Sequence, residues 1–104
     1  QRAKWVRRSP GRRSKVRKRG RAGAFRRFLL DAFGEAALRQ GTGVLDVGGG
    51  GQGALAFELM HLNGIPAAVV DPRWANPRKA ARRLARGHYH RPGPFAAYTS
   101  RPHR

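Results

Sequence analysis

The chain has 104 residues, of which 23 are lysine or arginine and only five are aspartate or glutamate, so its formal net charge is +18. This length allows one domain at most, and the lack of cysteine excludes disulfides and thiolate metal sites. No apolar run is long enough to cross a membrane, and we expect neither a membrane nor a metal as partner. Because residue 1 is glutamine, we interpret the chain as a processed product or a fragment.

The charges fall into three blocks. Residues 1–27 hold 13 basic residues and no acid, residues 28–71 hold all five acids, and residues 72–104 hold nine basic residues and no acid. We expect the flanks to be solvated and disordered, with RNA or another polyanion as partner, although GC-rich codons also explain part of the arginine excess. Contacts to nucleic acid are predicted at Arg12, Arg13, Lys15, Arg17, Lys18 and Arg19.

After a basic tail at residues 1–23, the chain changes to helical periodicity at Ala24. Apolar residues recur at the spacing of an amphipathic helix: Phe25, Phe28, Leu29, Ala32, Phe33 and Ala36. This pattern predicts that Arg26, Arg27 and Asp31 lie on the opposite side, and that Glu35 faces solvent. Gly34 is expected to break or bend the helix.

The middle of the chain reads as strand, helix and strand. Residues 44–47 and 67–70 are β-prone, residues 48–53 form a glycine turn, and residues 54–62 form a helix that ends at the stop signal Asn63-Gly64. One face of this helix carries Leu55, Leu59 and Leu62, and its Glu58 is expected in solvent. Such a unit implies two parallel, adjacent strands with a right-handed crossover.

A third helix is predicted from Asn76-Pro77 to Arg86, with Gly87 as its stop. Its arginines at positions 78, 82 and 86 form a cationic stripe. Residues 87–104 form a basic irregular tail. Within it, Phe95 and Tyr98 either stack on nucleic-acid bases or anchor the tail to its own domain.

Gly48, Gly50 and Gly53 fit the pattern G-x-G-x-x-G between a strand and a helix, where missing side chains let a ligand approach the backbone. Asp71 follows 23 residues after Gly48, near the position of an acid that binds a ribose. This is the arrangement of a nucleotide-binding, Rossmann-like βαβ unit; the alternative is a glycine-rich linker. Asp46 disfavours a pyrophosphate and favours a cationic ligand, such as the α-ammonium group of S-adenosylmethionine.

The segment GVLDVGGGGQGALAFELMHLNGIPAAVVDPR resembles the first βαβ of class I S-adenosylmethionine-dependent methyltransferases, and more closely an uncharacterised methyltransferase-like family of algae and other eukaryotes. The resemblance covers residues 24–73. It implies that Asp46, Gly48 and Gly50 form the cofactor loop and that Asp71 holds the ribose hydroxyls. Gln52 stands where that class has glycine, and Gly53 follows one residue later, which restores the spacing of an NAD(P) site.

These observations predict an α/β fold, a partial Rossmann-like βαβ unit at residues 24–86 with an N-terminal helix and disordered basic flanks. The first functional hypothesis is an N-terminal fragment of a methyltransferase, inactive by itself because its acceptor site and further strands are missing. No catalytic residue is assigned. The alternatives are a degenerate Rossmann-like component of a ribonucleoprotein, an NAD(P)-binding fragment and a product without activity. Nuclear, nucleolar and organelle locations all stay open.

Overall fold

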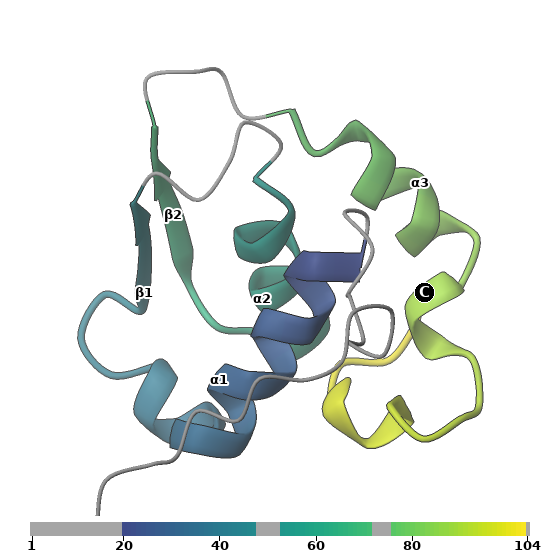
Figure 1. The fold of residues 1–104 in the computed structure, drawn as a ribbon, viewed down its shortest axis with the longest axis horizontal. Coiled ribbons are helices and arrows are strands. Elements are labelled where there is room, and N and C mark those ends of the chain that lie inside the picture. The colour runs from purple at the N-terminus through teal and green to yellow at the C-terminus, as the bar shows by residue number, and fades with distance from the viewer. Residues whose placement is uncertain (1–19, 48–52, 72–75, 104) are drawn as a thin grey trace, which may run out of the picture.

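Two short β-prone segments, Val44–Val47 (β1) and Ala67–Val70 (β2), pair as a parallel two-stranded sheet in a computed structural model of the chain (Figure 1). Val44 pairs with Ala67 and Val47 with Val70. The structure describes residues 20–47, 53–71 and 76–103. Together with three helices this sheet makes a small mixed α/β fold, and the predicted strands, their parallel direction and their adjacency are confirmed.

Helix α2, Ala54–Asn63, connects the strands and lies at the centre of the molecule. Its residues and those just after it supply most of the core, which consists of Ala56, Leu59, Leu62, Ile65 and, from α3, Ala80. Gly64 ends the helix in the left-handed conformation, with φ at +64°. The amides of Gly64 and Ile65 donate to the carbonyls of Met60 and Leu59, the hydrogen-bond pattern of a Schellman motif.

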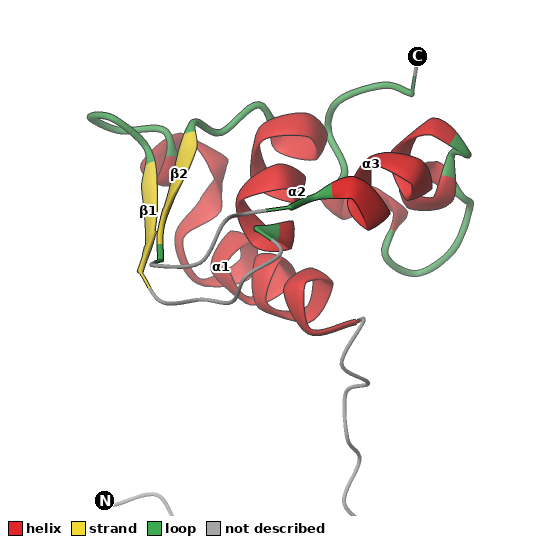
Figure 2. Cartoon of the chain, turned by 90° about the horizontal axis from the view of Figure 1, so that it is seen from above, coloured by secondary structure: helices red, strands yellow, loops and turns green. Residues whose placement is uncertain are grey.

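None of the described helices covers one of the two faces of the sheet. Helix α2 packs on the other face, while α1 (Arg21–Leu38) and α3 (Arg78–Ala85) pack on α2, as the view along the sheet in Figure 2 shows. Side chains alternate along a strand, so Leu45 and Val47 share the uncovered face with Val70. These three are 63%, 68% and 50% exposed. Among the residues that the structure describes, the sheet is therefore covered on one side only.

Helix α1 is present, but its predicted buried face is wrong. Phe25, Phe28 and Phe33 are 50%, 57% and 60% exposed, whereas Arg26 on the expected solvent side is buried. The periodicity of a sequence identifies an apolar stripe on a helix but does not show which element packs on that stripe. Among the described residues, no element packs on the phenylalanine stripe of α1. Gly34 has non-helical backbone angles, so the predicted break in the helix is confirmed.

The segment after α3 is irregular, as predicted, but it is not a solvated tail. It forms two short 3₁₀ turns, at His88–His90 and Ala96–Tyr98, and then returns to α2. The amides of Ser100 and Arg101 both donate to the carbonyl of Leu62, at 3.0 and 2.9 Å. The ordered part of the fold thus extends well beyond residue 86. Among the described residues, no helix combines the length and apolar character needed to cross a bilayer.

Gly43, just before β1, permits a close approach between the two chain segments that enter the sheet. Gly43 has φ at +94°, and a Cβ atom there would collide with the backbone carbonyl of Pro66. We expect Gly43→Ala to lower the free energy of unfolding by more than the roughly 1–3 kcal/mol of backbone strain. Gly41→Ala is the matched control, because Gly41 also has a positive φ but open space around it. Equal losses in urea denaturation would contradict the steric explanation.

Candidate functional site

The predicted cofactor site lies at the carboxyl edge of the sheet. Asp46 is the third residue of β1, paired with Val69, and its side chain is on the face toward α2. Asp71 directly follows β2 and is half-buried, with an interaction partner of its own. Because the strands are parallel, both carboxylates lie at the same edge, where α/β folds bind ligands. Gly48 and Gly50 lie outside the described residues.

Gly53 is the one loop glycine of the motif that the structure describes. It is buried and stands at the start of α2 in the left-handed conformation, with φ at +64° and ψ at +24°. Glycine adopts this conformation without the steric cost that other residues meet. The chain thus enters α2 through a turn suited to glycine, as the motif predicts, and the first amides of α2 lie beside the carboxyl edge of the sheet.

A second cluster, which the sequence did not predict, surrounds the buried guanidinium of Arg26. Its Nε donates to Oε1 of Glu58 at 3.3 Å, and its Nη1 donates to Oδ1 of Asn63 and to the carbonyl of Tyr98, both at 2.8 Å. Nη2 makes a longer contact of 3.5 Å with Oγ1 of Thr99. One side chain of α1 therefore joins α2 to the C-terminal segment.

Asn63 and Arg39 extend this cluster toward the end of α1. The amide nitrogen of Asn63 donates to Oε2 of Glu35 at 2.8 Å and to the carbonyl of Tyr98 at 2.7 Å. Arg39 pairs with Glu35 and also donates to the carbonyls of Asn63 and Gly64. Burial by itself would raise the pKa of Glu35, but hydrogen bonds from these and other neighbours outweigh it and lower that pKa.

The buried pair of Arg26 and Glu58 corrects the expectation that both face solvent. Both side chains are 4% exposed. Burial raises the pKa of Glu58 and lowers the pKa of Arg26, and the attraction between them only partly offsets these changes. Both pKa shifts disfavour the charged forms, so the free-energy cost of burying the two charges is larger than the gain from their attraction. We infer that the pair fixes how α1 packs and adds little net stability.

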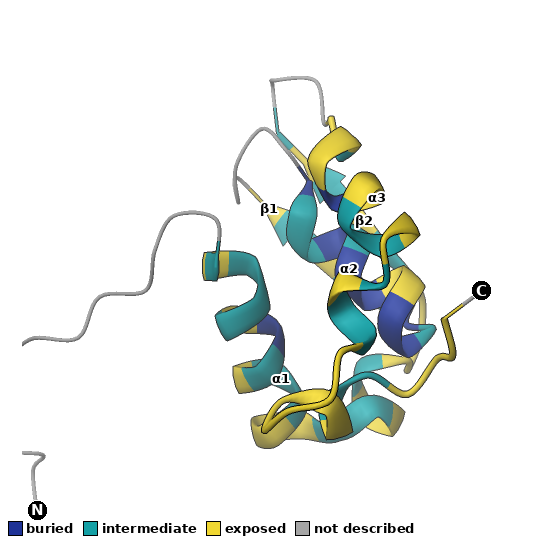
Figure 3. Cartoon of the chain, turned by 90° about the vertical axis from the view of Figure 1, so that its right-hand side faces the viewer, coloured by how far each residue is buried: buried dark blue, intermediate teal, exposed yellow. Residues whose placement is uncertain are grey.

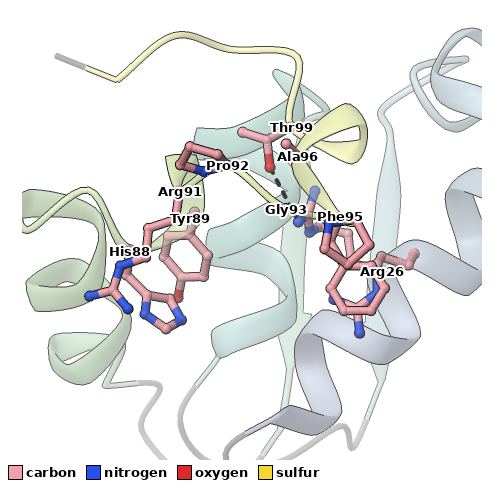
Figure 4. Close-up of a pocket in the computed structure, with 11 residues that line it drawn as sticks. Arg26, His88, Tyr89, Arg91, Pro92, Gly93, Phe95, Ala96 and Thr99 are labelled. Carbon is pink, nitrogen blue, oxygen red and sulfur yellow. Dashed lines mark hydrogen bonds between the residues drawn. The ribbon is translucent and has the colours of Figure 1, made fainter.

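Between the start of α1 and the C-terminal segment lies a cavity of about 230 Å³ (Figure 4). Its lining contains three arginines, a histidine and two aromatic rings, and none of the five acids. The arginines are Arg26, Arg27 and Arg91. Among the residues that the structure describes, no group of three histidine, aspartate or glutamate side chains is placed to hold a metal ion.

The predicted nucleic-acid contacts between Arg12 and Arg19 lie outside the described residues. Exposed basic residues are nevertheless present at α3, much of which is coloured as exposed in Figure 3. They are Arg78, Lys79 and Arg82 of the helix and Arg86, which follows its last residue. In residues 20–47, 53–71 and 76–103, two ion pairs are found, Arg26–Glu58 and Arg39–Glu35, and α3 takes part in neither.

No family model, no curated protein and no solved structure matches this chain.

Proposed function

We propose that this chain provides the cofactor-binding half of a methyltransferase-like α/β domain that binds S-adenosylmethionine. The observation that supports this most is the bare apolar face of the β1–β2 sheet, formed by Leu45, Val47 and Val70. Parallel sheets are buried on both faces in nearly all proteins that contain them. Helices beyond those described would cover this face, and further strands would pair with the edges of the sheet, which would complete a Rossmann-like domain.

The carboxyl edge of the sheet carries the chemistry in this proposal. Asp71, directly after β2, would accept hydrogen bonds from the ribose hydroxyls. Asp46 would contribute a negative charge near the α-ammonium group of the cofactor, where the pyrophosphate of NAD(P) would be repelled. Gly53 would bring the start of α2 close to the ligand. No residue is assigned to the transfer step, because the acceptor site would come from the remainder of the domain.

Isothermal titration of the complete domain with S-adenosylmethionine and with nicotinamide dinucleotides tests this proposal. We expect S-adenosylmethionine to bind more tightly, and Asp71→Ala to weaken its binding by about 1–3 kcal/mol, the value of one or two hydrogen bonds to the sugar. Asp31→Asn, which removes a carboxylate from α1, is the control and should leave the affinity unchanged. Tighter binding of a dinucleotide would reject the choice of cofactor.

A second candidate function is supported by the unpaired cations on α3. Arg78, Lys79 and Arg82 of α3, and Arg86 just after it, are exposed and form no ion pair with an acidic residue among the described residues. Arginine pairs with phosphate in a forked geometry and also stacks on bases. We therefore also propose that the chain binds RNA or a similar polyanion without sequence preference. Failure to shift single-stranded RNA at low salt would contradict it.

A further inference from the structure

The cavity between α1 and the C-terminal segment has the composition of an anion site. Arg26 is compensated by Glu58, but Arg27 and Arg91 take part in no ion pair in the described part of the chain. No acidic residue lines the cavity. Two uncompensated guanidinium groups around a concave space favour an anionic occupant, and phosphate suits the planar fork of arginine.

Phe95 adds an aromatic surface to this cavity. The guanidinium carbon of Arg27 lies 3.8 Å from the centre of the Phe95 ring, which is a cation–π contact. The ring is still 55% exposed. Because the contact leaves the edge of the guanidinium available, Arg27 could donate to a phosphate while a base stacks on the exposed aromatic surface.

The opposite wall of the cavity supplies further polar groups. In Figure 4, His88, Tyr89, Arg91 and Pro92 lie across the cavity from Phe95 and Arg26. The Tyr89 hydroxyl is buried without a hydrogen bond of good geometry, although Glu58 and Arg83 lie close enough to affect its pKa, which burial raises.

The size of the cavity limits its occupant. A volume of about 230 Å³ is below the roughly 300–1,000 Å³ of pockets that enclose a drug-sized ligand. A complete dinucleotide or S-adenosylmethionine would therefore not fit inside it, whereas one phosphate with part of a nucleoside would.

We propose that this cavity binds one nucleotide of single-stranded RNA, with its phosphate between Arg27 and Arg91 and its base against Phe95. This inference rests on the proposed binding of polyanions and adds a defined site to it. The site differs from both the carboxyl edge of the sheet and the cationic stripe of α3. The proposal predicts that part of the affinity for RNA comes from stacking of a base on Phe95, and that this part does not depend on salt.

Fluorescence anisotropy with a labelled eight-residue oligouridylate tests the proposal on the full chain. Phe95→Leu should weaken binding by about tenfold, the effect of losing one base–aromatic stack, without changing the salt dependence. Phe95→Tyr should bind within about twofold of the unmodified chain, since it keeps the ring. Arg27→Gln should weaken binding and reduce the slope of log affinity against log salt by about one.

Phe33→Leu is the matched control, because Phe33 is another exposed phenylalanine of the fold that does not line the cavity. Competition with uridine monophosphate and with inorganic phosphate separates a nucleotide site from a simple anion site. Equal effects of Phe95→Leu and Phe33→Leu, or equal competition by the two anions, would overturn the cavity proposal while general RNA binding stands. If the unmodified chain does not bind the oligouridylate, both proposals fail.

Discussion

Arg26→Met is expected to lower the free energy of unfolding by about 3–5 kcal/mol, the usual cost of leaving one partner of a buried ion pair without its counter-charge. Glu58 would stay buried at 3% exposure with its carboxylate uncompensated. Asn63 and the carbonyl of Tyr98 would each lose a hydrogen bond as well. Since small domains have only about 5–15 kcal/mol of stability, this single change removes a large part of it. Urea denaturation followed by circular dichroism measures the loss.

Two further variants distinguish the effect of an uncompensated buried charge on stability from the effect of losing a long side chain. Arg27→Met makes the same chemical change one residue later and should cost at most about 1 kcal/mol, the value of an exposed cation–π contact. The double variant Arg26→Met/Glu58→Leu removes both charges and should recover at least half of the loss, because desolvation no longer has to be offset. A double variant as unstable as Arg26→Met would show that the pair itself stabilises the fold.

Binding of single-stranded RNA should weaken by about three-hundredfold between 50 and 200 mM salt if six phosphates are contacted, because each neutralised phosphate releases counterions. Removing residues 1–19 deletes ten basic residues and leaves α1 complete, so it should weaken binding and flatten the salt dependence. Electrophoretic mobility shifts at a series of salt concentrations measure both quantities.

Two controls make this result specific. Asp71→Ala should leave the affinity and its salt dependence unchanged, since Asp71 belongs to the sheet edge. Replacing the arginines of residues 1–19 by lysine keeps the charge and should keep the slope. If the chain fails to shift RNA at 50 mM salt, codon bias becomes the explanation of its arginine content.

The sequence predicted the local elements well because their signals are local. The strands β1 and β2 have the predicted bounds, and Gly34, Gly64 and Gly87 interrupt or end helices where expected. Glycine acts at such points through its own backbone freedom, which does not depend on distant residues. The pair Asn76-Pro77 predicts a helix that begins at Pro77, and α3 begins one residue later, at Arg78.

The apolar face predicted for α2 is confirmed at Leu59 and Leu62, which are fully buried, but the sequence could not predict which charged side chains the fold buries. Arg26 and Glu58 are 32 residues apart, and each was assigned to solvent because charged residues are seldom buried. A buried ion pair depends on two elements meeting, and no spacing in the sequence encodes that. The same reason applies to the cavity, whose lining comes from α1 and from residues 88–99. Tyr98 is the exception, because the sequence allows it to anchor the C-terminal segment to the rest of the domain. Its hydroxyl donates to Asp31 of α1 at 2.9 Å.

The path of the C-terminal segment has a consequence for the order of folding during synthesis. Arg26 donates to the carbonyl of Tyr98, 72 residues later, and the carbonyl of Leu62 receives the amides of Ser100 and Arg101. Contacts between such distant positions form slowly, because a long loop must close before they form. While the chain grows from its N-terminus, α1 and α2 can meet early, but their buried polar groups stay partly unsatisfied until residues 98–101 arrive. The contacts between α1, α2 and the C-terminal segment therefore stay incomplete until residues 98–101 have been made.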